Sequence, residues 1–254
     1  MITETEGRFS RTELLYGPDA VKALAGARVA VFGLGGVGGY VVEALARSGV
    51  GALDLVDHDR VALSNLNRQI IATERTLGQY KVDAAGERVL SINPDCTVTA
   101  HRLFFLPETA GEIDFSVFDY VADAVDNITA KLTLIECAKH AGIPVISAMG
   151  TGNKLDPAKL RVSDIYETSV CPLARVMRKE CRRRGVTGLK VVWSEEEPMV
   201  PPVSEEESDS ACPEDPARSG GWKRITPASN AAVPATAGLL MASEIINDLI
   251  KRYR

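Results

Sequence analysis

A stretch of about 30 residues constrains the fold of this chain more than any other feature. A short β-branched run at 28–32 (RVAVF) is followed at once by the glycine cluster GLGGVG at 33–38. A helical pattern then runs from Val37 to Ser48, and a second apolar run, Ala52–Val56, closes the unit. This order of strand, glycine turn, helix and strand is typical of a βαβ unit, in which the two strands are parallel.

The remainder of the first half repeats the alternation. Helices are predicted over Glu74–Ser91 and Ile128–Ala141, and strands over Cys96–Leu103, Tyr120–Ala122 and Ile143–Ala148. Strands that alternate with helices form a parallel sheet covered by helices on both faces. We therefore predict an α/β fold, a Rossmann-like doubly wound and mostly parallel sheet.

The pattern changes after Gly150. Strands are predicted over Leu160–Ile165 and Leu189–Ser194, and they extend the sheet with antiparallel strands. A basic helix over Pro172–Arg184 lies between them, and a buried amphipathic helix over Ala231–Tyr253 ends the chain. We expect a single domain over 1–254, made of a nucleotide-binding half (1–150) and a substrate and dimer half (151–254).

Residues 195–217 contain nine acidic residues, five prolines and no basic residue. Such a segment buries little apolar surface, so a mobile acidic loop is predicted at about 195–220. The whole chain has a net charge of -5, and a polyanionic partner therefore needs a local basic patch.

Five scattered cysteines contain no CxxC pair, so neither a zinc site nor a disulfide framework is expected. Together with an N-terminus that lacks the apolar core of a signal peptide, this favours a reducing cytoplasm. The last helix carries Glu244, Asn247 and Asp248, so no membrane span is expected.

The glycine cluster predicts a phosphate site. Gly33, Gly35, Gly36 and Gly38 let the backbone turn tightly and approach an anion at a helix N-terminus. Asp57 ends the second strand, where a carboxylate accepts hydrogen bonds from ribose hydroxyls. A tight-packing role for the turn and a capping role for Asp57 remain the alternatives.

The next motif separates two kinds of nucleotide enzyme. The polar run 64–69 (SNLNRQ) carries Arg68, and Lys81 opens a helical pattern after Gly78. Hydride transfer builds no charge at phosphorus, whereas attack on the α-phosphate of ATP does, and two cations can offset that charge. We therefore favour an ATP-using enzyme over an NAD-dependent oxidoreductase, with a surface role for Lys81 as the alternative.

Acidic residues follow the strand that ends at Ala122. Asp123 and Asp126 belong to the run DAVDN, at the sheet edge where ligands bind in doubly wound folds. Asp126 is our candidate for Mg²⁺ that accompanies ATP, since a carboxylate oxygen suits this ion. Asp126 or Asn127 is also a candidate N-cap of the helix that follows, and Asn127 can cap while Asp126 binds metal.

Taken together, these motifs resemble the ubiquitin-activating-like adenylating (ThiF/MoeB) family. The resemblance rests on the RFSR start, GLGGVG, LVDHD, SNLNRQ, the GQYK lysine and DAVDN, and is clearest from Arg8 to about Gly150. It implies an ATP-dependent enzyme that adenylates a carboxylate. Its implied nucleotide contacts are Gly33, Gly35, Gly36, Gly38, Asp57, Ser64, Asn65, Asn67, Arg68, Lys81, Asp126 and Asn127.

The resemblance also implies an obligate homodimer, in which an N-terminal arginine reaches the neighbouring subunit's site. Arg11 matches that position, and Arg8 is the second choice. Arg11, Arg68, Lys81 and Asp126 are accordingly the candidate catalytic residues. A cysteine desulfurase system is a candidate further partner.

The second half lacks the paired CxxC zinc ligands of the sulfur-carrier branch and is similar to the bacterial tRNA threonylcarbamoyladenosine dehydratase branch. This similarity implies activation of a carboxylate on a tRNA base beside the anticodon. Activation of a ubiquitin-like sulfur-carrier protein is the alternative. The candidate tRNA contacts are Arg175, Arg178, Lys179, Arg182, Arg183 and Arg184, which could instead pair with the acidic loop. Cys212, in that loop, is a weaker functional candidate.

Overall fold

A computed structural model describes residues 7–200 and 227–253 of the chain. Residues 1–6, 201–226 and 254 lie outside this description. Most of the predicted acidic loop therefore falls outside it, and so does Cys212.

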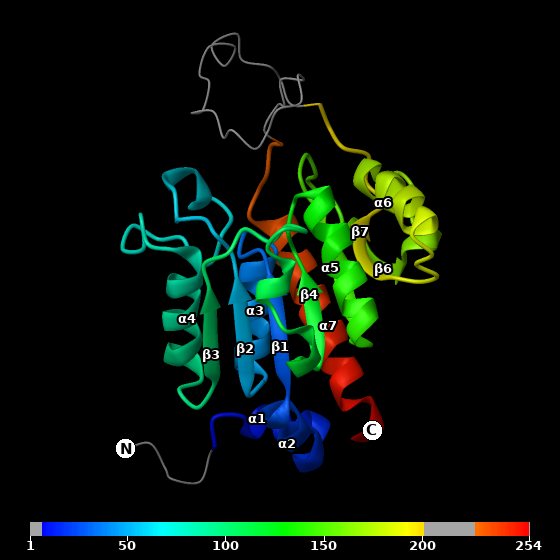
Figure 1. The fold of residues 1–254 in the computed structure, drawn as a ribbon. Coiled ribbons are helices and arrows are strands. Elements are labelled where there is room, and N and C mark those ends of the chain that lie inside the picture. The colour runs from blue at the N-terminus through cyan, green and yellow to red at the C-terminus, as the bar shows by residue number, and fades with distance from the viewer. Residues whose placement is uncertain (1–6, 201–226, 254) are drawn as a thin grey trace.

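Within the described residues, seven strands form one sheet in the order β3-β2-β1-β4-β5-β7-β6 (Figure 1). The pairs along the sheet are parallel except for β6 with β7, which is antiparallel. The predicted fold class, a doubly wound and mostly parallel sheet extended in its second half, is confirmed. The strands are β1 (Arg28–Phe32), β2 (Ala52–Val56), β3 (Thr97–His101), β4 (Tyr120–Asp123), β5 (Val145–Ala148), β6 (Leu160–Asp164) and β7 (Lys190–Ser194).

Helices cover both faces of this sheet (Figure 1). The core on one face contains side chains of α2 (Pro18–Gly26), α3 (Gly38–Arg47), α4 (Lys81–Ile92) and α7 (Ala232–Ile250). The cores on the other face contain side chains of α5 (Ile128–Ala141) and α6 (Pro172–Arg183). A short first helix, α1 (Ser10–Tyr16), packs on α2 at the amino end of the strands.

The central strand β1 shows why an uninterrupted apolar run was needed. Val29 and Val31 belong to the core with α3 and α7, whereas Ala30 and Phe32 belong to the core with α5. Alternate residues of a strand point to opposite faces, so a strand buried on both sides requires apolar residues at every position.

The predicted helix over Glu74–Ser91 is wrong at its start, because α4 begins only at Lys81. Gly78 has a φ of +79°, which ends any helical run there. Tyr80 is extended and forms an antiparallel bridge with Arg60. Residues 73–80 therefore form turns, and these turns place Lys81 at the first position of the helix.

The final helix α7 lies in the core, as expected. Its buried residues include Val233, Met241 and Ile245, and it packs against α3 and against β5, β6 and β7. By length and composition alone it is also the one helix among the described residues that is long and apolar enough to cross a membrane. Half of its most apolar window is buried inside the protein, which is the position of a core helix.

We expect Gly51→Ala to destabilise the fold. A Cβ atom at residue 51 would lie 1.8 Å from the backbone oxygen of Ala25, so the β2 and α2 backbones must separate. The expected loss is about 1–3 kcal/mol in the free energy of unfolding, measured by urea denaturation. The matched control is Gly26→Ala, where a Cβ meets nothing within 4 Å and a gain of about 0.4–1 kcal/mol is expected. Equal unfolding midpoints for the two variants would contradict this packing.

Candidate functional site

The glycine turn joins β1 to α3, and at two of its glycines, Gly33 and Gly38, the protein backbone occupies the space where a side chain would lie. Gly33 has a φ of +84°, and a Cβ there would meet Ala124 O at 2.7 Å. A Cβ at residue 38 would lie 1.8 Å from Gly33 O. No side chain caps the N-terminus of α3. The turn therefore presents backbone amides and a positive helix end to an anion.

The Asp57 carboxylate holds this turn in place. Its Oδ2 accepts a hydrogen bond from Leu34 N at 2.7 Å, and its Oδ1 accepts one from Asp59 N at 2.8 Å. The capping role that we left open is therefore real, and it ties β2 to the glycine turn. Each carboxylate oxygen has a second lone pair, so the predicted ribose contact remains chemically available.

Arg68 lies beside the glycine turn. The position of a Cβ at residue 36 is 3.4 Å from its Cγ. Its Nη1 donates to Ser64 O and Asn67 Oδ1, both at 2.9 Å. The guanidinium is thus held by the SNLNRQ segment itself and keeps further N–H donors for an anion.

Two asparagines of the same segment hold the backbone. Asn65 Oδ1 accepts from Ala62 N at 3.0 Å. Asn67 Nδ2 donates to Ser229 O at 3.1 Å, which attaches the segment to the chain just before α7. These contacts fix the loop that carries Arg68. They leave the predicted nucleotide contacts of Ser64, Asn65 and Asn67 as predictions.

Lys81 is buried at the start of α4. Its Nζ lies 2.7 Å from Asp59 Oδ2, so the carboxylate, which is half exposed, balances the charge of the ammonium. Asp57, His58 and Asp59 form the one group of three among the described residues with metal-ligand geometry, and Lys81 already occupies one of its oxygens. The partnership of Lys81 with Asp59 was not predicted from the sequence. The signal was available in LVDHD, two residues beyond Asp57.

Two buried polar side chains were also missed, and Gln69 is the one that lies at the site. Gln69 lies under the turn, where the position of a Cβ at residue 35 is 3.9 Å from its Nε2, and its Oε1 has no hydrogen-bond partner within the described chain. Lys154, in the loop after β5, donates to Glu196 O. Burial lowers the pKa of Lys154, and the negative charge of Glu196 partly opposes that shift.

The run DAVDN begins with the last residue of β4, and three of its residues have different surroundings. Asn127 Oδ1 accepts from Ala130 N at 3.1 Å and caps α5, as we considered. Asp126 is exposed and makes no hydrogen bond or ion pair with the described residues. Asp123, by contrast, is completely buried and cannot serve a ligand.

Asp123 belongs to a buried cluster at the ends of β4 and β5. Lys131 Nζ on α5 lies 3.1 Å from both oxygens of Asp123 and 3.3 Å from Ser147 Oγ. Ser147 Oγ donates to Asp123 Oδ2 at 2.5 Å, and Asp123 Oδ1 accepts from Val125 N at 3.2 Å. This ion pair anchors the loop that presents Asp126.

The residues present fit an adenine nucleotide with magnesium. A Cβ at residue 35 would meet only Gln69 Nε2, at 3.9 Å, so the turn is open there. Gln69 has an unpartnered amide oxygen under the turn, and Arg68 keeps free donors. Asp126 supplies an unpaired carboxylate of the kind that Mg²⁺ prefers. These groups lie along the carboxyl ends of β1, β2 and β4, where the strand order reverses and ligands bind in such sheets.

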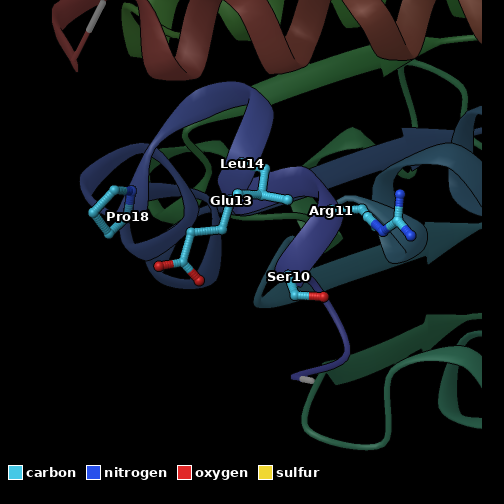
Figure 2. A pocket seen from close by; sticks show the side chains of 5 residues that line it. All are labelled: Ser10, Arg11, Glu13, Leu14 and Pro18. Atoms are coloured by element: carbon cyan, nitrogen blue, oxygen red, sulfur yellow. The ribbon is translucent and has the colours of Figure 1, made fainter. Parts of the chain in front are cut away.

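Arg11 is not brought to this edge. It is an exposed residue of α1, at the amino ends of the strands, beside a hollow that it lines with Ser10, Glu13, Leu14 and Pro18 (Figures 1 and 2). Figure 2 shows its side chain extending away from Glu13 and Pro18. Arg8, the second choice, donates to Ile92 O at 2.9 Å and is therefore engaged within its own chain.

The basic segment forms α6, at the far side of α5 from the glycine turn (Figure 1). Its six cations differ in their surroundings. Arg178 and Arg184 are partly buried and bonded within the fold, whereas the remaining four are exposed. In the described part of the predicted acidic loop, Glu195 pairs with Arg161 and Glu196 accepts from Leu155 N and Asp156 N, not from this segment. The rest of that loop lies outside the described residues.

The sequence matches the ThiF family over residues 9–253. The chain belongs to the ThiF family. It is 42% identical over 246 residues to the tRNA threonylcarbamoyladenosine dehydratase of Bacillus subtilis (strain 168). The aligned residues cover 96% of this chain and 95% of that protein.

Solved structures give the same answer. The Escherichia coli tRNA N6-threonylcarbamoyladenosine dehydratase in complex with AMP has a TM-score of 0.83 at 31% identity, covering 96% of this chain and 94% of that one. The same enzyme in complex with ATP has a TM-score of 0.81 at 30% identity, with the same coverage. Our assignment to the adenylating family, closest in pattern to the dehydratase branch, is thereby confirmed.

We expect Lys131→Met to destabilise this ThiF-family protein by about 3–5 kcal/mol, because it leaves the Asp123 carboxylate buried without a counter-charge. Urea denaturation gives the free energy of unfolding. The matched control is Arg183→Met, which removes one exposed partner of Glu180 and should change that free energy by less than about 1 kcal/mol. A Lys131→Met protein as stable as the control would contradict the stabilising role assigned to this buried ion pair.

Proposed function

We propose that the protein is an ATP-dependent tRNA threonylcarbamoyladenosine dehydratase. It adenylates the carboxylate of threonylcarbamoyladenosine beside the anticodon and closes a ring on that side chain, with net loss of water. The observation that carries the proposal is the similarity, along nearly the whole chain, to proteins of that name. The glycine turn with Arg68 and Lys81 beside it supplies the chemistry that such a reaction needs.

The reaction is chemically consistent with the site. A carboxylate is a poor electrophile, and ATP supplies it with a leaving group by transfer of AMP and release of pyrophosphate. The α3 N-terminus, Arg68 and Lys81 offset the charge that gathers on the attacked phosphate. A nucleophilic atom of the same modified base then displaces AMP, and the intramolecular geometry removes most of the entropic barrier.

Asp126 and Asp59 have separate tasks in this proposal. Asp126 holds Mg²⁺, because it is the exposed, unpaired carboxylate at the end of β4. Asp59 orients the Lys81 ammonium until the triphosphate arrives. Asp57 holds the glycine turn and accepts from the ribose.

A homodimer completes the site. Arg11 lies on α1 at the amino ends of the strands, and its own glycine turn lies at their carboxyl ends. It can therefore serve a nucleotide only in a second copy of the chain. Leu14 and Leu15 on the same helix are 83% and 74% exposed, which suits an interface between copies. We place this dimer in the cytoplasm, without zinc and without a membrane span, and a cysteine desulfurase system remains a candidate partner.

A product assay tests the reaction. Purified protein, ATP and Mg²⁺ are incubated with tRNA that carries threonylcarbamoyladenosine, isolated from a strain in which the corresponding gene is deleted. We expect its nucleosides to lose the mass of one water, with release of AMP and pyrophosphate. A carrier protein ending in Gly-Gly is the parallel substrate, and ATP–pyrophosphate exchange with that carrier but not with tRNA would overturn the proposal.

Single substitutions test the site. We expect Asp126→Ala and Lys81→Ala each to lower turnover by at least about 100-fold, the effect of removing a group that stabilises transition-state charge. The control, Lys22→Ala on the exposed side of α2, should keep wild-type turnover. Circular dichroism and the thermal midpoint check that each variant is folded. Wild-type rates in a folded Asp126→Ala or Lys81→Ala protein would contradict the assignment.

A further inference from the structure

The cations of α6 fall into two groups according to their contacts. Arg178 donates to Thr168 O at 2.7 Å and also to Thr168 Oγ1, so it holds the loop before the helix. Arg184 pairs with Glu136 at 3.0 Å and with Glu180, and Arg183 lies 3.1 Å from Glu180. These three arginines already bond to groups of the protein, Arg178 and Arg184 in partly buried positions and Arg183 at the surface.

The other three cations are Arg175, Lys179 and Arg182. They are spaced by four and three residues, so they lie on one face of the helix and span roughly 10 Å along its axis. All three are exposed, and none forms an ion pair with a carboxylate of the described residues. We call this set the α6 stripe.

Two side chains beside the α6 stripe, Glu180 and Tyr166, leave its positive charges unpaired. Glu180 is bound to Arg184 and Arg183, and the hydrogen bond from Arg184 lowers its pKa. The Arg182 guanidinium lies 5.1 Å from the centroid of the Tyr166 ring. Stacking on a ring restrains a guanidinium but leaves its N–H donors available to an anion.

The α6 stripe begins near the carboxyl ends of the parallel strands, where the candidate nucleotide site lies. A Cβ at Gly150, just beyond β5, would lie 3.8 Å from both Cys171 Sγ and Leu173 Cβ, at the start of α6. Strand β5 adjoins β4, which leads to Asp126. Arg175 is therefore the member nearest the candidate catalytic edge, and Lys179 and Arg182 continue away from it.

We propose that the α6 stripe binds consecutive phosphates of the substrate RNA next to the modified nucleotide. This inference rests on the proposed function, and it divides the six predicted tRNA contacts into three that bind RNA and three that already bond to groups of the protein. Three unpaired cations in line suit a phosphate backbone, which attracts them without sequence readout. The chain as a whole carries a charge of -5, so such a local row must supply the attraction.

Two triple variants test the stripe in the full-length protein. The stripe variant is Arg175→Gln/Lys179→Gln/Arg182→Gln. The control variant is Lys22→Gln/Lys251→Gln/Arg252→Gln, which also removes three exposed charges, one of them an arginine stacked on a tyrosine. The control residues lie on α2 and after α7, near the amino ends of the strands (Figure 1). For both variants, the binding constant for the modified tRNA and the steady-state kinetic constants are measured over a range of KCl concentrations.

A plot of the logarithm of the tRNA association constant against the logarithm of the KCl concentration has a negative slope. We expect the stripe variant to make this slope shallower by about 3 units, roughly one per lost phosphate contact. Its KM for tRNA should rise about tenfold or more at low salt, whereas kcat, the KM for ATP and the thermal midpoint stay at wild-type values. The control variant should match the wild type in slope and KM.

Unchanged slope and KM in the stripe variant, with active wild-type enzyme, would overturn the inference and leave the proposed function intact. A wild-type enzyme that does not modify the tRNA would instead refute the proposed function. Equal losses in the two triple variants, or a stripe that binds anionic vesicles or an acidic peptide and not RNA, would also overturn it.

Discussion

The ligand edge of this protein depends on direct backbone contact between the turns that follow β1 and β4. A Cβ at Gly33 would meet Ala124 O, and a Cβ at Gly38 would overlap Gly33 O. Because no side chain separates these segments, the α3 N-terminus and the loop carrying Asp126 come to the same edge. Asp57 supports the contact from β2, through its hydrogen bond to Leu34 N. That packing places a helix N-terminus, which attracts anions, close to the loop that carries the Asp126 carboxylate.

Two buried lysines near the carboxyl ends of the strands differ in the exposure of the carboxylates that pair with them. Lys131 is 1% exposed and is paired with a carboxylate that has no exposure at all. Breaking such a pair is costly, so it is suited to holding a loop. Lys81 is paired with Asp59, which is half exposed. Asp59 opens this pair to solvent although Lys81 itself is buried, and the proposed phosphate-binding role of Lys81 requires that opening.

The same distinction applies to the basic helix. From the sequence, its six cations are equivalent members of one charged run. In the fold, Arg178 and Arg184 contact α5 and the loop before α6, whereas Arg175, Lys179 and Arg182 face outward. A helix that packs on one side divides its charges in this way. Arg183 is also exposed, but it pairs with Glu180, so the three other exposed cations are the ones without an ion pair to the described residues.

The sequence by itself determined the class of fold and the positions of the nucleotide motifs. An apolar run such as RVAVF must be buried on both faces, and GLGGVG after it permits one kind of turn, so both are local properties of the chain. Only the tertiary structure decided which polar groups meet. Lys131 reaches Asp123 and Ser147 from a separate helix, and Gln69 lies beneath the glycine turn, contacts that no spacing rule encodes. The start of α4 at Lys81 likewise depends on the Tyr80–Arg60 bridge, a long-range pairing that local helix propensity cannot anticipate.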